Sequence, residues 1–466
     1  MARYISIVRA ILWTCVALVI VIMLAVWRYR PDIGIRVGTA SISQTFCDEV
    51  FVSGLDPNRV FAEDILPQHA LHRLLKRVRY TVNRQRHQVV TTWAGHFAGV
   101  ATFYPGYGCM LGNAKPSEDA PGSAAASNPA ASAASSENSA APVTTGNPQL
   151  SEALDRAFAE PPQPPYRQVR AIVIMRDGKI IAERYAPGIG PDTPLLSYSV
   201  SKSVINALVG ILVGQGKLNL YAPAPVAAWS SPSDPRHAIT LDELLRMTSG
   251  LNLEESDSGF DPVSRMMFLE RDMAGFAEKA KLIATPGQTW NYTSGNTLIA
   301  SAILRDAVGG TAADVLRFAH RHLFDPVGMH HVTVEFDGAG TPIGSTRILA
   351  SGRDWARFGE LYLNDGVLDG KRILPEGWVS YSTKPTLDSP YGSGFWVNGG
   401  RSKDAQARVR AGMPADSFYA SGNFGQRIVI IPSQKLVIVR FGVTVDPPNF
   451  DMRGLLRLVN DAIAAR

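Results

Sequence analysis

A serine-rich stretch at residues 195–218 holds the side chains best suited to chemistry. It reads LLSYSVSKSVINALVGILVGQGKL and places four serines and one lysine around the start of an apolar run. Lys202 follows Ser199 by three residues, so on a helix both side chains lie on one face. A hydroxyl needs a nearby base to become a nucleophile, and a lysine shielded from water can lose its proton near neutral pH. Ser199 and Lys202 are therefore a candidate nucleophile and base.

The residues around this pair predict a buried helix that would hold it. Apolar side chains recur at helical spacing on two adjoining faces, which are formed by Val200, Val204, Leu208 and Ile211 and by Ile205, Val209 and Leu212. Gly214 and Gly216 end the helix. Ser199 would stand in the first turn, where backbone N–H groups favour a developing anion, and Ser201 and Ser203 would point elsewhere. The alternative, a plain helix cap with a surface lysine, fits poorly because the run is too apolar for a surface helix.

Two pairs of β-rich runs flank this helix at a distance along the chain. AIVIMRDGKIIAERY carries a strong hairpin signal at Asp177-Gly178, and RIVIIPSQKLVIVRFG forms a second pair near the C-terminus. An amphipathic helix follows at residues 451–466. Hairpins at both ends with a helix-rich middle predict one antiparallel sheet built from both ends of the domain and covered by helices. The expected fold class is α/β, of the α+β type, with an all-helical subregion.

Several motifs occur in the order found in the serine β-lactamase and penicillin-binding-protein superfamily. SYSVSKS resembles the nucleophile motif of that superfamily, and is closest to class C β-lactamases and their esterase relatives. Four later stretches of the chain also resemble segments of the family, in the family's order. They are ITLDELLRMTSGL, TPGQTWNYTSGNTLIASAIL, GSTRILASGRDWARFGELYLNDG and GKRILPEGWV. The resemblance runs from about Val169 to the C-terminus. It implies a β-lactamase-like fold and a serine hydrolase, near the esterases and nylon-oligomer hydrolases.

The resemblance also implies roles for individual residues. Ser199 would be the nucleophile that forms an acyl-enzyme, and Lys202 would be its base. Tyr292, in the YTS that follows a Pro-Gly turn, would relay protons to the leaving group. Ser294 would stand where class C enzymes have Asn. A core tyrosine without a catalytic role is the alternative at Tyr292, because other tyrosines of the chain also fit the Tyr-x-Ser/Asn pattern.

The third family motif departs from its usual form in this chain. The family places Lys-Thr-Gly or His-x-Gly on an inner strand, and the corresponding residues here are Ala420, Ser421 and Gly422. The backbone N–H of Asn423 would pair with that of the nucleophile as an oxyanion hole. Because the cation is missing, the sequence argues against recognition of the carboxylate of β-lactams or D-Ala-D-Ala peptides. Arg427 is either a substitute cation or a strand residue that faces solvent.

The N-terminal part predicts a membrane anchor and a disulfide. Residues 10–27, AILWTCVALVIVIMLAVW, are uncharged and just long enough to cross a bilayer as a helix; a cleaved signal peptide is the alternative. Outside this segment, which contains Cys15, the chain has Cys47 and Cys109. An even pair predicts a disulfide in an oxidising compartment, with two free buried thiols as the alternative. We therefore expect a single-pass inner-membrane protein with its catalytic domain on the periplasmic side.

Changes in composition divide the chain into four parts. Residues 1–30 would be the anchor, and residues 31–113 a small module without recognisable chemistry. Residues 114–149 are rich in Ala, Ser and Pro and have too little apolar surface to fold, so they predict a disordered linker. Residues 150–466 would form the hydrolase domain.

Composition and motifs argue against several other classes of protein. A net charge of +5 is modest for 466 residues, and the basic stretch at residues 72–87 is typical of a solvated surface near anionic lipids, so no nucleic-acid partner is expected. The chain lacks the Gly-x-Ser-x-Gly motif of α/β-hydrolases and a phosphate-binding glycine loop. Its histidine pairs, at 320/322 and 330/331, have no companion ligands at metal spacing, so neither a metal nor a cofactor is expected.

The sequence therefore predicts a membrane-anchored serine hydrolase that cleaves a small ester or amide through a Ser199 acyl-enzyme. A non-catalytic cell-envelope binding protein of the same fold is one alternative. A penicillin-binding D-Ala peptidase or β-lactamase is another. The joint presence of Ser199, Lys202 and Tyr292 favours an enzyme, since loss of catalysis would not be expected to spare all three.

Overall fold

The computed structural model describes most of the chain, namely residues 9, 11–18, 20–21, 23, 30–112, 114, 141–256, 258–445 and 452–465. Most of the predicted linker lies outside these residues. The predicted anchor at residues 10–27 lies partly outside them, and no helix within the described part is both long and apolar enough to cross a membrane. The structure therefore does not support the transmembrane helix that the sequence predicts. Cys15 is an exposed free cysteine.

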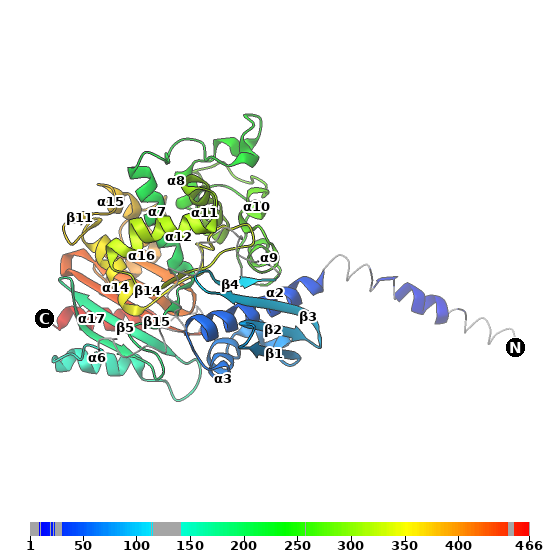
Figure 1. The fold of residues 1–466 in the computed structure, drawn as a ribbon, viewed down its shortest axis with the longest axis horizontal. Helices are drawn as coiled ribbons and strands as arrows, with labels where there is room; N and C mark the ends of the chain where they lie inside the picture. The colour runs from blue at the N-terminus through cyan, green and yellow to red at the C-terminus, as the bar shows by residue number, and fades with distance from the viewer. Residues whose placement is uncertain are drawn as a thin grey trace.

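A six-stranded antiparallel sheet forms the centre of the larger part of the protein (Figure 1). In spatial order its strands are β12 (Trp396–Val397), β13 (Phe418–Gly422), β14 (Gln426–Ile431), β15 (Leu436–Gly442), β5 (Val169–Arg176) and β6 (Lys179–Tyr185). The late strand β15 pairs with the early strand β5, and Val439 lies opposite Val173. The sheet is thus built from both ends of the domain, and this prediction is confirmed.

The turn between β5 and β6 has the conformation that its sequence favours. Asp177 and Gly178 both have positive φ angles, of 48° and 74°. Two successive positive φ angles are typical of the tight type I′ turn, for which Asp-Gly is a preferred pair. The sequence signal therefore identifies the hairpin.

Helices cover both faces of the large sheet. They are α6 (Pro148–Phe158), α7 (Ser201–Gly214), α14 (Gly352–Leu363) and α17 (Met452–Ala464). Side chains of a strand point alternately to opposite faces. Ile172 and Ile174 of β5 pack with α6 and α17, whereas Ala171 and Val173 pack in the core that contains α7 and α14. The result is a helix, sheet and helix arrangement, and the predicted α/β class is confirmed.

A helical subregion lies above the sheet in Figure 1. Its helices are α8 (Leu241–Leu245), α9 (Pro262–Leu269), α10 (Met273–Glu278), α11 (Ser294–Val308), α12 (Ala312–Ala319) and α13 (Asp325–Val327). A three-stranded sheet of β7 (Leu195–Leu196), β9 (Ile348–Ala350) and β8 (Val332–Val334) leads into the nucleophile stretch. The smaller elements are β10 (Val367–Leu368), β11 (Lys371–Arg372), α15 (Trp378–Thr383) and α16 (Lys403–Arg410).

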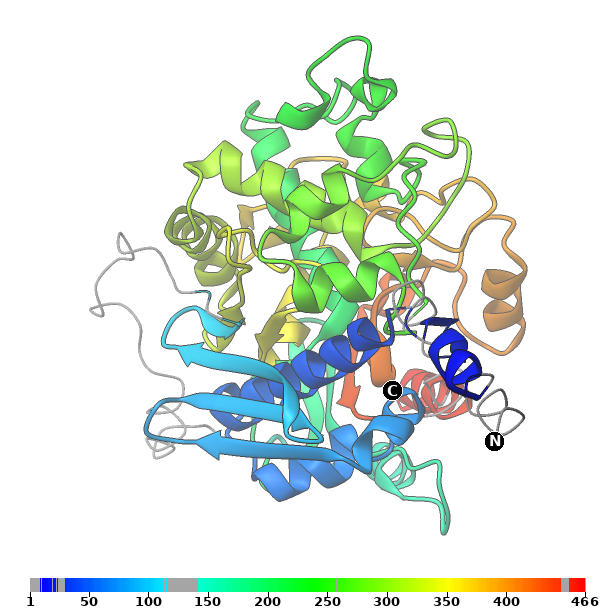
Figure 2. The same cartoon turned by 90° about the vertical axis from the view of Figure 1, so that its right-hand side faces the viewer.

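The N-terminal module consists of a long helix packed on a four-stranded antiparallel sheet (Figure 2). Its elements are α2 (Pro31–Cys47), α3 (Pro57–Val60), α4 (His72–Leu75), β1 (Val78–Asn83), β2 (Gln88–Trp93), β3 (His96–Tyr104) and β4 (Gly108–Leu111). The helix approaches β3 closely, because a Cβ at Gly99 would come within 2.3 Å of the carbonyl oxygen of Thr39. Ser43 Oγ also donates to the carbonyl oxygen of Gly99 at 2.9 Å. One face of α2 is thereby fixed to the module sheet.

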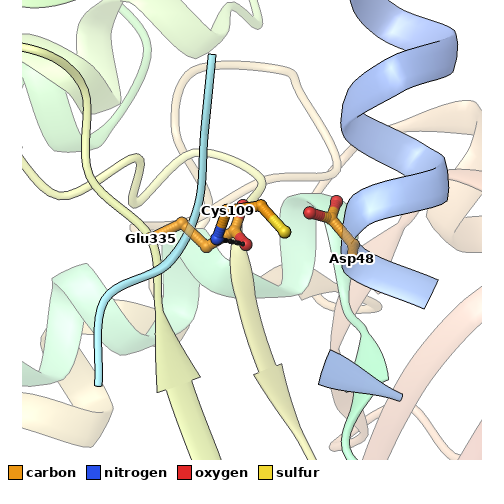
Figure 3. Close-up of side chains that lie close together, drawn as sticks. All are labelled: Asp48, Cys109 and Glu335. Carbon is orange, nitrogen blue, oxygen red and sulfur yellow. Dashed lines mark hydrogen bonds between the residues drawn. The ribbon is translucent and has the colours of Figure 1, made fainter. Parts of the chain in front are cut away.

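A disulfide joins the end of α2 to β4. Cys47 is bonded to Cys109, so the predicted pairing is confirmed. Beside it, Asp48 forms an ion pair with Arg347 of the larger domain. Glu335, also from the larger domain, accepts a hydrogen bond from the backbone N–H of Cys109 at 2.6 Å (Figure 3). The disulfide therefore lies where the module meets the larger domain.

The disulfide and the ion pair explain why the side chains drawn in Figure 3 lie close together. Asp48, Cys109 and Glu335 lie close enough together to resemble a ligand set. The sulfur of Cys109 is held in the disulfide, however, and Asp48 is paired with Arg347. Burial raises the pKa of Glu335 well above its usual range and that of Asp48 to about 6. These carboxyl groups are therefore easier to protonate than carboxyl groups in water, and the cluster serves as a buried contact between module and domain.

Candidate active site

The nucleophile stretch forms a tight turn in front of a buried helix. Ser199 lies in a single 3-10 turn, Tyr198–Val200, and α7 begins at Ser201. Tyr198 has a φ of 48°, a sparsely populated value for a non-glycine residue that is often found at functional sites. Its ring packs edge-on against Phe424 with the centroids 5.0 Å apart. This contact supports the turn that presents Ser199.

Lys202 lies one turn beyond Ser199 and points back at it. Its Nζ is 3.0 Å from Ser199 Oγ, and it also donates to Ser294 Oγ at 3.2 Å and to the carbonyl oxygen of Ser345 at 3.0 Å. Nζ lies 4.9 Å from the centroid of the Tyr292 ring. Only 2% of Lys202 is exposed. The structure therefore brings the predicted nucleophile and base together and shields the lysine from water.

The hydroxyls of Ser201 and Ser203 form hydrogen bonds with segments outside α7. Ser201 Oγ lies 2.9 Å from Ser197 Oγ and accepts a hydrogen bond from the backbone N–H of Ile348 at 3.0 Å. Ser203 Oγ donates to the carbonyl oxygen of Gly394 at 2.6 Å. These two hydroxyls tie α7 to neighbouring segments, so Ser199 is the serine of this stretch that approaches the lysine.

Tyr292 completes the group around the nucleophile. It lines the same cavity as Ser199, and its ring packs against Tyr391 and Trp396 at centroid distances of 5.5 and 5.4 Å. Burial raises the pKa of Tyr292, and the charge of Glu255 adds to the rise, although the charge of Arg427 opposes it. The phenol therefore keeps its proton at neutral pH. It is suited to donate that proton to a leaving group.

Glu255 is a site residue that the sequence analysis did not identify. Its carboxylate accepts hydrogen bonds from the backbone N–H of Ser294 at 2.5 Å and from Ser294 Oγ at 2.9 Å. Ser294 Oγ in turn accepts from Lys202 Nζ at 3.2 Å. One hydroxyl thus connects a carboxylate to the buried lysine. Glu255 lies in an irregular loop far from Ser294 in sequence, and no local pattern relates the two.

The end of β13 lies directly beside the nucleophile turn. A Cβ at Gly422 would come within 2.2 Å of the carbonyl oxygen of Ser197, so only glycine fits there. Ser421, Gly422 and Asn423 line the same cavity as Ser199. The structure therefore places the segment that the sequence assigns to the oxyanion hole next to the candidate nucleophile.

Arg427 faces the cavity rather than solvent. It stands opposite Ser421 in the pairing of β13 with β14, and it is 8% exposed. Its guanidinium donates to the carbonyl oxygens of Gly422 and Gln426 at 2.8 and 2.7 Å. Burial lowers the pKa of Arg427 to about 10, so the side chain remains a cation at neutral pH. Of the two interpretations of Arg427, the structure excludes the solvent-facing one.

These residues line one large cavity of about 1030 Å³. Ligand-binding cavities commonly measure roughly 300–1,000 Å³, so this one has room for more than a short ester. Its polar lining includes Ser199, Glu255, Tyr292, Ser294 and Arg427. The arrangement of a shielded lysine against a partly exposed serine, with a tyrosine close to the lysine, is suited to acyl transfer.

A family model described as Beta-lactamase matches residues 154–462, which is more than half of the sequence. The chain belongs to the beta-lactamase family. This confirms the resemblance drawn from the motifs, and it fits the sheet built from both ends of the domain. The matched segment of this beta-lactamase family member begins after the N-terminal module.

Individual relatives agree with this assignment. The 6-aminohexanoate-dimer hydrolase of Paenarthrobacter ureafaciens is 26% identical over 306 residues, which cover 61% of this chain and 75% of that protein. The structure of a family VIII carboxylesterase matches with a TM-score of 0.54 and 15% identity over 69% of this chain and 99% of its own. A penicillin-binding protein homologue from Caulobacter crescentus matches with a TM-score of 0.53 and 18% identity over 68% and 97%. At these identities the two structures show the shared fold alone.

Proposed function

We propose that this member of the beta-lactamase family is a serine hydrolase that cleaves an ester or amide through a Ser199 acyl-enzyme. The observation that carries the proposal is the 3.0 Å contact between Lys202 Nζ and Ser199 Oγ in the wall of a large cavity. Tyr292 adds a proton donor beside this pair, because its ring centroid lies 4.9 Å from Lys202 Nζ and it lines the same cavity as Ser199. Nucleophile, base and acid are thus within reach of one another.

In the proposed reaction, neutral Lys202 takes the hydroxyl proton as Ser199 Oγ attacks the substrate carbonyl carbon. The backbone N–H groups of Ser199 and Asn423 stabilise the oxyanion that forms. When the tetrahedral intermediate collapses, Tyr292 gives its proton to the leaving alcohol or amine and regains one from Lys202. Water then attacks the acyl-enzyme and loses a proton to the same base. Collapse of the second intermediate releases the acid and restores the hydroxyl of Ser199.

Glu255 is assigned a supporting role in this scheme. Its carboxylate is connected to Lys202 through Ser294 Oγ. A nearby negative charge favours the protonated lysine, which exists only after the nucleophile has given up its proton. Glu255 would therefore stabilise the charged state that develops during acylation, and it would hold Ser294 in position to accept from the lysine.

The names of the relatives support an ester or amide as the substrate. One relative is a 6-aminohexanoate-dimer hydrolase, and a protein of the same fold is a carboxylesterase. The third motif of this chain, Ala420-Ser421-Gly422, lacks the Lys or His that the resemblance leads one to expect. These observations favour uncyclised esters and amides over penicillins.

Esters are accordingly expected to turn over much faster than penicillins. The guanidinium of Arg427 already donates to the carbonyl oxygens of Gly422 and Gln426, so a substrate carboxylate is expected to be poorly paired in the site. The kcat/KM for benzylpenicillin should therefore fall below that for an activated acetate ester on the order of 10²-fold or more. Steady-state kinetics on the purified full chain measure both. Comparable values would contradict the prediction, and loss of only the penicillin activity in Arg427→Leu would then identify Arg427 as the recognising cation.

We also propose that the protein is located in the cell envelope, with an N-terminal membrane anchor and the catalytic domain on the periplasmic side. The uncharged run at residues 10–27 and the Cys47–Cys109 bond support it, because disulfides persist in oxidising compartments.

The disulfide is expected to be formed in the cell and to stabilise the fold. It closes a loop with a sequence separation of 62, for which chain entropy gives about 4 kcal/mol of unfolding free energy. Urea unfolding of the Cys47→Ser/Cys109→Ser protein against the wild type measures that difference. Non-reducing peptide mapping of protein recovered from the cell envelope should find the two cysteines linked. Free thiols at both positions would argue against an oxidising location.

A further inference from the structure

Helix α2 of the N-terminal module forms part of the wall of the catalytic cavity. Residues that share one face of this helix line the same cavity as Ser199, and they are Gly34, Val37, Gly38, Ser41 and Thr45. Another face of α2 carries Ser43, whose hydroxyl is bonded to Gly99 of the module sheet. The helix therefore lies between the module sheet and the cavity.

Helix α9 connects this wall with the candidate base. The hydroxyl of Ser345, whose carbonyl oxygen accepts from Lys202, lies 3.7 Å from the Sδ of Met267 in α9. Phe260, just before α9, packs on Gly34 of α2, where a Cβ would come within 2.5 Å of the Phe260 ring. Met267 lies five residues beyond the first residue of α9, Pro262, which corresponds to about 8 Å along the helix. One continuous wall thus runs from the neighbourhood of the lysine to the N-terminal module.

Apolar side chains of the module and of α9 line this wall, namely Ile35, Val37, Leu71, Leu74, Val263, Met267 and Phe268. Polar side chains of the same segments stand among them, namely Ser41, Thr45, Gln68, His69 and Ser264. Phe260 completes the wall and is 60% exposed, a large fraction for an aromatic side chain. Apolar surface of this kind favours ligand groups that are themselves apolar, because binding removes both surfaces from water. The cavity therefore combines a polar reaction centre with an apolar extension.

Buried contacts hold the module in place against the catalytic domain. Arg347, which also lines the cavity, pairs with Asp48. Arg170 of β5 pairs with Glu49 at 3.1 Å and with Asp64 at 2.5 Å. The five side chains of the module and the domain in these pairs are all almost completely buried. The wall is thus a fixed part of the cavity, although the family match begins only at residue 154.

We propose that the wall formed by α2 and α9 binds a linear apolar chain of the substrate. The N-terminal module then acts as a specificity element that makes the enzyme prefer esters or amides with long alkyl or acyl chains over their short counterparts. This inference rests on the proposed hydrolase function, and it adds to that function the substrate class and the part of the protein that selects it.

The test is a chain-length profile measured with the full chain. One series uses a constant leaving group with linear acyl chains from acetyl to decanoyl, and the other uses acetate esters of linear alcohols from methyl to decyl. In one of the two series kcat/KM is expected to rise by about fourfold per methylene group until the wall is covered. Ser41→Phe places a ring in the cavity and should lower the ratio of long-chain to short-chain kcat/KM by about tenfold or more. Arg36→Ala, on the exposed side of α2, should leave the ratio unchanged.

A binding experiment separates this inference from the proposed function. Calorimetry of N-alkylacetamides with the Ser199→Ala protein should show affinity that increases with alkyl length. Ile35→Ser in the Ser199→Ala background should weaken the binding of the long-chain amides most. This second variant tests the wall even if the Ser41→Phe protein does not fold. Length-dependent binding without turnover of any ester would overturn the hydrolase proposal alone. Flat profiles in both ester series, or an unchanged ratio in a Ser41→Phe protein whose circular dichroism matches the wild type, would overturn the wall as a substrate site.

Discussion

Ser199→Ala is expected to abolish both ester turnover and labelling by a fluorophosphonate. The substitution removes the hydroxyl that Lys202 contacts, and the remaining groups cannot form an acyl-enzyme. Loss of a nucleophile from a unit of this kind lowers kcat on the order of 10⁶-fold. Steady-state assays with an activated ester, together with in-gel detection of a fluorescent fluorophosphonate, measure the effect.

Ser201→Ala and Ser203→Ala are the matched controls for this experiment. Both hydroxyls are buried and bonded to neighbouring segments, so their removal should cost about 1 kcal/mol of stability rather than catalysis. The folded control proteins are expected to label and to turn over ester at nearly the wild-type rate. A labelled Ser199→Ala protein, or a dead Ser201→Ala protein with an intact fold, would show that the nucleophile has been assigned wrongly.

Lys202→Met is expected to slow acylation by several orders of magnitude. Methionine has a similar length and tolerates the buried position, but it cannot accept the proton of Ser199. Because nucleophile and base act as a unit, the Ser199→Ala/Lys202→Met double variant should be no slower than Ser199→Ala. Stopped-flow detection of the released leaving group measures the acylation rate. A Lys202→Met rate within about tenfold of the wild type would assign the base to another group and leave Lys202 a structural role.

The parts of the site that are local in sequence could be predicted from the sequence. Ser199 and Lys202 are three residues apart, and the apolar spacing after them fixes which face of the helix they share. The hairpin at Asp177-Gly178 is likewise encoded in a short stretch, through residues that accept positive φ. The nucleophile itself lies in a 3-10 turn just before the helix, a boundary detail that periodicity does not resolve.

The parts that depend on contacts distant in sequence could not be predicted. Glu255 reaches Ser294 across 39 positions of sequence, and nothing near either residue signals the contact. The side to which Arg427 points depends on strand pairing and on what covers each face, so the sequence left two interpretations open. Helix α2 belongs to a module with no recognisable chemistry, and its place in the cavity wall arises only when the module packs on the catalytic domain.

Intact-mass analysis followed by peptide mapping can detect the proposed acyl-enzyme at Ser199. The full chain is treated with a fluorophosphonate and, separately, with an activated ester at low temperature, and the adducts are located by tandem mass spectrometry. We expect one adduct per chain, on the peptide that contains Ser199, and none in the Ser199→Ala protein. No adduct under either treatment, or a single adduct on a residue other than Ser199, would contradict the proposed acyl-enzyme.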